Sequence, residues 1–309
     1  MVPDLSTTLG PLVLRTPIVV ASGVFGFGNE YPDLEGFDFE GVGAITLKGV
    51  TLEPSEGNRP PRIAEVASGL VNSIGLQNPG VDALVEKILP SLPELPCKII
   101  ANISGSAVEE YEQVAQRLAA TDRLDAIEVN VSCPNVKRGG MLFGCDPKMT
   151  EEVTRVVKRQ TKLPVIVKLT PNVADIRPTA TAAMDGGADA LSLINTLRAL
   201  VIDAELRRPL LGATFGGLSG PAIKPVALYH VYQAYSVARE RGIAILGMGG
   251  AATATDVVEF MLAGASAVGI GSPLFWDHRI CAKAAAGLRD WMVAHKTASV
   301  RELVGGMRV

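Results

Sequence analysis

Short apolar runs that recur along the whole chain are the feature that most limits its fold. Between most of these runs lie stretches whose apolar residues have helical spacing, such as 108–118 and 226–237. Continuous apolar strands separated by helices are typical of a parallel sheet buried on both faces. Eight such runs predict a closed (β/α)8 barrel, the TIM barrel. The runs span residues 17–20, 44–47, 98–101, 126–131, 165–169, 190–194, 244–246 and 267–270.

The main alternative is an open, doubly wound sheet. A dinucleotide-binding sheet of that type normally has a G-x-G-x-x-G turn that opens a helix after an early strand. The glycine-rich segment 21–28 follows the first run, but no convincing helix opens there, so we favour the barrel. Since no low-complexity linker divides the chain, we expect a single domain, residues 1–309. The gaps 48–97 and 195–243 are too long for one helix and predict loops inserted over the C-terminal mouth.

The composition excludes two classes of partner. The formal net charge is −3, from 29 basic and 32 acidic residues, and no basic run stands out, so no nucleic-acid partner is expected. The longest uncharged stretch, 260–276, is broken by glycines and a proline and predicts no membrane helix. Four cysteines and an N-terminus without a secretory pattern favour a reducing cytoplasm.

Polar residues follow the apolar runs. In a barrel the active site lies at the carboxyl ends of the strands, so these residues are expected to converge on one rim. Any one of them alone could be a solvated turn residue. They are Ser22, Gly23, Lys48, Asn102, Asn130, Ser132, Cys133, Lys168, Asn195, Thr196, Gly249, Gly250, Gly271 and Ser272.

Glycines mark the ends of the last two runs. Gly249 and Gly250 follow the seventh run, and Gly271 with Ser272 follows the eighth. Loops at these two places of such barrels frequently bind phosphate through uncovered backbone N–H groups. Either pair alone could serve only a tight turn, but together they predict a phosphorylated ligand.

Two lysines end apolar runs, where an ammonium needs an anionic or electron-rich partner unless it extends to water. These are Lys48 and Lys168. A redox cofactor whose ring gains negative charge on reduction would be such a partner for Lys168. A Schiff base with a carbonyl substrate is the other chemical option.

Cys133 lies in the segment Asn130-Val-Ser-Cys-Pro-Asn135, just before the glycine-containing stretch 137–144. This setting predicts a reactive thiol beneath a lid. Cys97, Cys145 and Cys281 have no comparable setting and are interpreted as inert. No C-x-x-C pair occurs and the chain has three histidines, so no metal site is expected.

Asparagines are frequent among the candidate residues. Amides offer donors and acceptors without charge, which suits a planar heterocycle with alternating C=O and N–H groups. Two of them, Asn78 and Asn172, are also interpreted as caps of loops. The set is Asn72, Asn78, Asn102, Asn130, Asn135, Asn172 and Asn195.

Five segments carry a resemblance to a known family. They are 72–80, 130–135, 194–196, 216–225 and 247–250, and they look like those of the class 1 dihydroorotate dehydrogenases, with a match from Ala21 to about Ser272. Within this class, the segments 194–196 and 216–225 are most similar to the 1B catalytic subunit. That subunit works with an electron-transfer subunit that carries FAD and a 2Fe-2S cluster. One departure is the sequence Ser-Pro-Leu-Phe-Trp-Asp after Gly271, where a threonine and small residues are expected.

The resemblance implies a tightly held FMN and assigns residues to it and to the substrate. The residues implied for FMN are Ser22, Lys48, Gly49, Asn102, Asn130, Lys168, Ile194, Gly220, Gly249, Gly250, Gly271 and Ser272. Those implied for the substrate ring are Lys48, Asn72, Ser73, Ile74, Gly75, Leu76, Asn130, Asn135, Asn195 and Thr196. A homodimer is also implied.

The resemblance further implies oxidation of dihydroorotate to orotate in the de novo biosynthesis of UMP. Cys133 would be the general base, hydride would pass to the flavin N5, and Lys168 would stabilise the reduced flavin. Electrons would reach NAD through the partner subunit, with direct use of fumarate as the alternative. Two readings from other classes share the barrel: a colourless aldolase or isomerase that uses Lys168, and a barrel that binds a phosphorylated ligand without turning it over.

Overall fold

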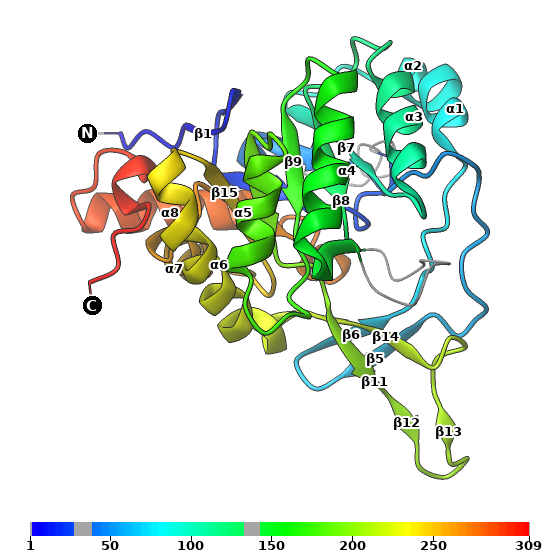
Figure 1. Cartoon of the computed structure of the whole chain (residues 1–309). Helices are drawn as coiled ribbons and strands as arrows, with labels where there is room; N and C mark the ends of the chain where they lie inside the picture. Colours follow the sequence, from blue (N-terminus) through cyan, green and yellow to red (C-terminus); the bar gives the residue numbers. More distant parts are fainter. Residues whose placement is uncertain (1, 28–38, 133–142, 309) are drawn as a thin grey trace.

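Eight parallel strands form a closed barrel at the centre of the molecule (Figure 1). The computed structural model describes residues 2–27, 39–132 and 143–308. The strands follow one another around the barrel in chain order, and each predicted apolar run overlaps one of them. The (β/α)8 prediction is therefore confirmed. The strands are β3 (Ile18–Val20), β4 (Ala44–Thr46), β7 (Lys98–Ile103), β8 (Ala126–Asn130), β9 (Val165–Lys168), β10 (Ala190–Leu193), β15 (Ala244–Met248) and β16 (Ala267–Ile270).

The strand boundaries differ from the predicted runs by up to two residues. The largest differences are at β7 and β15. Because β7 continues to Ile103, Asn102 lies within a strand and not after it. Lys168 is likewise the last residue of β9. Both side chains are buried, with Asn102 2% and Lys168 6% exposed. The polar residues thus begin inside the barrel, below its rim.

Inside the barrel, a layer of apolar side chains is followed by polar side chains two residues further along four of the strands. Side chains alternate between the two faces of a strand, so residues two positions apart share a face. Inward-facing apolar residues form one buried cluster that includes Val19, Ala44, Ile100, Ala126, Ile166, Ala190, Leu246 and Ala267. Two residues further along four of these strands stand Asn102, Glu128, Lys168 and Ser192, all buried. The barrel therefore has an apolar layer beneath a polar one.

A hairpin closes the amino end of the barrel. Strands β1 (Thr7–Leu9) and β2 (Leu12–Leu14) pair antiparallel. Leu9, Leu12 and Leu14 are buried in the same cluster as the inward-facing barrel residues. In Figure 1, β1 lies at the opposite end of the barrel from the strands β5, β6, β11 and β14. The apolar interior is thereby sealed at the end away from the predicted site.

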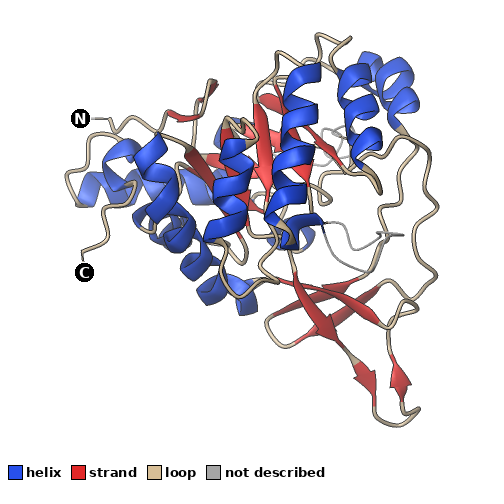
Figure 2. Cartoon of the chain, viewed as in Figure 1, coloured by secondary structure: helices blue, strands red, loops and turns tan. Residues whose placement is uncertain are grey.

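Helices form the outer layer of the molecule (Figure 2). On α3, the buried residues Tyr111, Val114, Ala115 and Leu118 recur with helical spacing and make one apolar face toward the barrel. α4 begins where the Asp146 side chain accepts a hydrogen bond from the backbone N–H of Lys148, with Pro147 in the first turn. The long helices are α3 (Val108–Leu118), α4 (Pro147–Gln160), α5 (Arg177–Asp185), α6 (Lys224–Ala238), α7 (Ala254–Leu262) and α8 (Ile280–Ala294). A shorter helical segment comprises α1 (Val81–Ala83), a π turn (Leu84–Ile88) and α2 (Leu89–Ser91).

The sequence predicts loops for the two long insertions, but in the structure they form an antiparallel sheet. Its strand order is β11-β14-β6-β5, so the segment before β7 pairs with the segment after β10. These strands are β5 (Ile63–Val66), β6 (Gly69–Asn72), β11 (Leu197–Leu200) and β14 (Phe215–Ser219). A short ribbon of β12 (Ile202–Asp203) and β13 (Arg208–Pro209) extends from it, away from the barrel (Figure 1). Among the described residues, no helix is both long and apolar enough to span a bilayer.

Candidate active site

A cavity of about 850 Å³ lies at the carboxyl ends of the barrel strands, and residues of the antiparallel sheet line part of it. Each of the eight strands contributes at least one lining residue from its carboxyl-terminal part or from the turn after it. Every described residue that the resemblance assigns to FMN or to the substrate lines this cavity. These residues are Ser22, Lys48, Gly49, Asn72, Ser73, Ile74, Gly75, Leu76, Asn102, Asn130, Lys168, Ile194, Asn195, Thr196, Gly220, Gly249, Gly250, Gly271 and Ser272.

Two predicted residues, Cys133 and Asn135, lie outside the described residues. The chain that leads to Cys133 is described up to Ser132, which is held at two points. The Ser132 backbone N–H donates to Asn130 Oδ1 at 3.1 Å, and the Ser132 hydroxyl donates to the Lys168 carbonyl at 3.3 Å. Ser132 itself lines the cavity. The segment before Cys133 is therefore anchored at the cavity wall.

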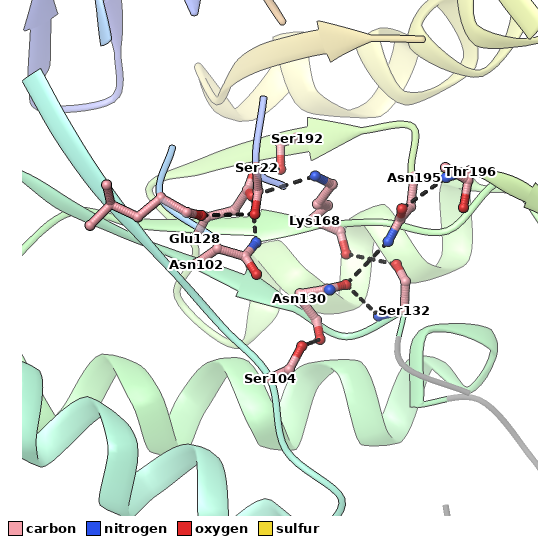
Figure 3. Close-up of polar contacts among 11 residues, drawn as sticks. Ser22, Asn102, Ser104, Glu128, Asn130, Ser132, Lys168, Ser192, Asn195 and Thr196 are labelled. Atoms are coloured by element: carbon pink, nitrogen blue, oxygen red, sulfur yellow. Dashed lines mark hydrogen bonds and ion pairs between the residues drawn. The ribbon is translucent and has the colours of Figure 1, made fainter. Parts of the chain in front are cut away.

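A hydrogen-bonded group of three buried side chains lies inside the barrel beside the cavity, and one of the three, Asn102, lines it (Figure 3). The Asn102 Nδ2 group donates to Glu128 Oε2 at 2.6 Å, and the Ser192 hydroxyl donates to Glu128 Oε1 at 2.7 Å. The Lys168 Nζ atom lies 3.6 Å from Glu128 Oε2. The Lys168 and Glu128 side chains are 7% and 1% exposed. This lysine therefore has an anionic partner inside the barrel while it also lines the cavity.

Asparagines at the ends of β8 and β10, the two strands that flank β9, bond to each other along the wall. Asn195 Nδ2 donates to Asn130 Oδ1 at 3.3 Å, and the Thr196 backbone N–H donates to Asn195 Oδ1 at 2.8 Å (Figure 3). The Tyr111 hydroxyl donates to the Asn130 carbonyl at 2.8 Å. Because Asn130 Oδ1 also accepts from Ser132, the orientation of the Asn130 amide is fixed. This wall presents oriented amide groups to a ligand.

The segment 72–76, which begins at the last residue of β6, forms another part of the wall. Gly75 and Leu76 both have positive φ angles, 76° and 55°, so the chain turns sharply here. The Asn58 Nδ2 group donates to the Ser73 hydroxyl at 2.8 Å and fixes the turn from outside. Asn78 is buried and donates to the Leu76 carbonyl at 2.7 Å, which agrees with its interpretation as a loop cap.

The glycines after β15 and β16 form an open cradle. Gly249 and Gly250 have φ angles of 126° and 82°, which side-chain-bearing residues rarely adopt. A Cβ at Gly250 would lie 2.7 Å from the Gly220 carbonyl oxygen, so Gly220 and Gly250 are in close contact. At Gly271 a Cβ would meet one protein atom within 4 Å, the Ala21 Cβ at 3.7 Å, and would otherwise point into open space. The Gly271 backbone thus faces the cavity with no side chain in the way.

The structure adds residues that the strand-end argument missed. Glu128 and Ser192 lie within β8 and β10, three and two positions before the ends of the apolar runs 126–131 and 190–194. The alternation of faces along β8 puts Glu128 on the same face as Asn130 and was the signal for it. Asn172, interpreted partly as a cap, does accept from the Arg198 backbone N–H at 2.9 Å, and it also lines the cavity. Thr170, Arg198 and Phe215 line the cavity as well.

The cysteines away from the cavity fit their interpretation as inert. Burial raises the pKa of both the Cys97 and the Cys281 thiols to about 12, so neither forms a thiolate at neutral pH. Burial also raises the pKa of Cys145. The chemistry of a thiolate is therefore not expected from these three residues.

Comparisons with known proteins agree with this geometry. A sequence profile described as dihydroorotate dehydrogenase matches residues 4–292. The chain is 49% identical over 300 residues to a protein of Desulforudis audaxviator named dihydroorotate dehydrogenase B (NAD(+)), catalytic subunit, covering 97% of this chain and 96% of that one. A protein of the same name from Desulforamulus reducens is 49% identical over 302 residues, covering 98% of both chains.

A solved structure extends the likeness to the fold. The crystal structure of DHODH in complex with ferulenol from Eimeria tenella superposes with a TM-score of 0.81 at 22% sequence identity. The match covers 98% of this chain and 88% of that one. At this identity the likeness concerns the fold.

Proposed function

The chain belongs to the dihydroorotate dehydrogenase family, and from this premise we propose that it oxidises dihydroorotate to orotate in pyrimidine biosynthesis, as the catalytic subunit of an NAD-linked enzyme. The observation that carries the proposal is the shared cavity at the carboxyl ends of the strands. Every described residue that the resemblance assigns to substrate or FMN lines it. Relatives at 46–49% identity bear the name of the NAD-linked catalytic subunit.

The residues of the cavity fit FMN, the cofactor of this family. The Gly271 backbone faces open space, and Gly249 and Gly250 have positive φ angles, as a phosphate-binding cradle requires. The cavity also contains the Lys168 ammonium, a suitable partner for a ring that gains negative charge. We assign the phosphate to Gly220, Gly249, Gly250, Gly271 and Ser272.

Different residues around the cavity remove the proton, hold the substrate and stabilise negative charge. FMN, when bound, supplies the acceptor for the hydride. Cys133 takes the acidic proton beside the substrate carbonyl, and Ser132, anchored to Asn130 and Lys168, holds the chain that carries Cys133. The oriented amides of Asn130 and Asn195 hold the planar substrate. Lys168 stabilises negative charge that develops on the ring side of the cavity.

The electron acceptor is assigned to a second subunit. Since the relatives are named as catalytic subunits of an NAD-linked enzyme, we propose a partner that carries FAD and a 2Fe-2S cluster and passes the electrons to NAD. We further propose a homodimeric core, a cytoplasmic location and one barrel domain over residues 1–309.

A spectroscopic experiment tests the half-reaction. The chain as purified, without added FMN, is expected to be yellow and to bleach when dihydroorotate is added without oxygen. A colourless protein that turns over another substrate through Lys168 would contradict the proposal. The same bleaching, followed by rapid reoxidation with fumarate in the absence of a partner subunit, would overturn the assignment of the acceptor alone.

Replacing the proposed base separates catalysis from binding. In Cys133→Ser, orotate is expected to bind with nearly unchanged affinity, while flavin reduction slows by about 100-fold at neutral pH. In the parent chain the rate should rise with pH as a larger fraction of the thiol ionises. A variant that reduces FMN at the parent rate at every pH would exclude Cys133 as the base.

A further inference from the structure

Glu128 is a carboxylate enclosed by the barrel. It lies in the middle of β8 and is 1% exposed, on the same strand face as the apolar Ala126 and the site residue Asn130. Moving a carboxylate from water to such a place is strongly unfavourable unless hydrogen bonds and an opposite charge compensate for it. Its surroundings must therefore supply both.

Three strands supply these partners. Asn102 on β7 donates to one carboxylate oxygen at 2.6 Å, and Ser192 on β10 donates to the other at 2.7 Å. Lys168 on β9 provides the opposite charge at 3.6 Å (Figure 3). Both oxygens of Glu128 are engaged, and two of the three partners, Asn102 and Lys168, line the cavity. Glu128 is thus bonded to two cavity-lining residues while it is itself enclosed.

The contact with Asn102 decides which end of that amide a ligand can meet. Its Nδ2 group is used by Glu128. Its oxygen lies on the side of Gly49, because a Cβ at Gly49 would be 2.7 Å from Asn102 Oδ1. Gly49 lines the cavity. Asn102 therefore offers an acceptor to the ring N–H of a ligand on that side, and Glu128 fixes this orientation.

The contact with Lys168 balances charge. An ammonium that lines the cavity favours a ligand that becomes anionic, and here it favours reduced over oxidised flavin. A buried carboxylate 3.6 Å away acts in the opposite direction on the same ligand. The net electrostatic preference of the cavity for a reduced ring depends on both charges.

We propose that Glu128 is a positioning residue that orients Asn102 and Lys168 and limits how strongly the site favours reduced over oxidised FMN. This inference rests on the proposed function, because it assumes that FMN occupies the cavity. It assigns to Glu128 two effects on the flavin that a carboxylate serving only the stability of the barrel would not have.

The test measures the midpoint potential of the bound FMN in two variants with opposite expected shifts. Glu128→Gln keeps the size of the side chain and removes its charge, so the ratio of affinities for reduced over oxidised FMN should rise roughly tenfold, a shift of about +30 mV for a two-electron couple. Ser192→Ala keeps the carboxylate and removes one of its hydrogen bonds, leaving its charge less compensated. Its potential should shift to more negative values by a smaller amount.

A matched control is Glu259→Gln, which removes a carboxylate from α7, on the outside of the barrel, and should leave the potential unchanged. Glu128→Leu removes both charge and hydrogen bonds, so its affinity for oxidised FMN should fall at least about tenfold as Asn102 loses its orientation. If Glu128→Gln does not fold, the sign of the shift in Ser192→Ala decides. Unchanged potentials in the variants that bind FMN would overturn the role of Glu128.

These measurements need no dihydroorotate, so they distinguish the two proposals. A parent chain that fails to bind FMN would contradict the proposed function. If the parent chain binds FMN and the midpoint potentials of the variants equal that of the parent, only the role of Glu128 is overturned.

Discussion

Two ion clusters join the same types of side chain in different surroundings. Inside the barrel, Lys168 lies 3.6 Å from Glu128, and the two side chains are 7% and 1% exposed. Outside it, Lys224 at the start of α6 contacts Asp256 at 2.6 Å and Glu259 at 2.7 Å, both on α7. The three outer side chains are 27%, 11% and 39% exposed.

The difference shows how a lysine is kept available for a ligand. Lys224 makes two short contacts with carboxylates, and its pKa is raised by the hydrogen bonds to Asp256 and Glu259. These bonds tie α6 to α7 beside the glycine cradle, since a Cβ at Gly250 would lie 3.0 Å from Lys224 Cβ. Among the described residues, Lys168 has one ion-pair contact, the longer one with Glu128, and it lines the cavity. The outer cluster thus stabilises the scaffold, whereas the inner one leaves its ammonium able to bind a further anion.

Breaking the inner cluster should have the largest effect. Lys168→Met leaves the Glu128 carboxylate buried without its cation, so we expect the free energy of unfolding to fall by about 3 kcal/mol. Flavin reduction should slow by about 100-fold or more, because the ammonium is lost at the ring. Urea unfolding and anaerobic stopped-flow absorbance measure the two effects.

The double variant Lys168→Met/Glu128→Gln is the control for this prediction. It removes the uncompensated charge, so it should regain much of the stability but not the rate. A single variant as stable as the parent would contradict the view that the inner pair is desolvated.

Breaking the outer cluster at Asp256 should have an intermediate effect. This carboxylate accepts from Lys224 and from the backbone N–H groups of Ala252 and Thr253, and it completes the capping box of α7. Asp256→Asn should lower the free energy of unfolding by about 1–2 kcal/mol. Flavin reduction should change little. A rate loss as large as that of Lys168→Met would show that the two clusters do not differ in role.

The effect of Asp256→Asn should depend on pH in a defined direction. Burial raises the pKa of Asp256, but hydrogen bonds from Lys224 and the Thr253 region outweigh it and leave the pKa below the usual 3.8. A lowered folded-state pKa stabilises the chain above the unfolded-state value, and this contribution disappears as the pH falls through the folded-state pKa. The stability difference between the parent and the variant should therefore be constant near neutrality and narrow below about pH 4. A difference that widened in acid would contradict this.

Removing the more exposed carboxylate of the outer cluster should have the smallest effect. The Glu259 side chain is 39% exposed, so solvent screens its contact with Lys224. Glu259→Gln should lower the free energy of unfolding by at most about 0.5 kcal/mol, and less at high salt. A loss equal to that of Asp256→Asn would show that exposure does not separate the two carboxylates.

The barrel and the end that carries the candidate site were predictable from the sequence, because strands buried on both faces are continuous apolar runs. Barrel strands are buried on both faces, so β9 and β16 stand out as apolar runs. The same reasoning places Lys48, Asn130 and Gly249 at one end of the barrel, where the structure has them line one cavity. The resemblance assigned roles to these positions that their spacing alone did not.

The remainder depends on contacts between distant segments. Pairing of β6 with β14 joins residues about 145 positions apart, and nothing local in either segment indicates the other. Glu128 was missed for another reason. It lies in the middle of the run 126–131, whereas the polar residues predicted to be functional lie at or after the ends of the runs. The period of two along β8 nevertheless puts Glu128 on the same face as Asn130.

The leucines of the β1–β2 hairpin block the amino end of the barrel, so the cavity has no exit at that end. A molecule cannot pass along the axis from one end to the other, so orotate departs through the mouth by which the next dihydroorotate arrives. Product and substrate therefore exclude one another, and orotate should act as a competitive inhibitor of its own formation.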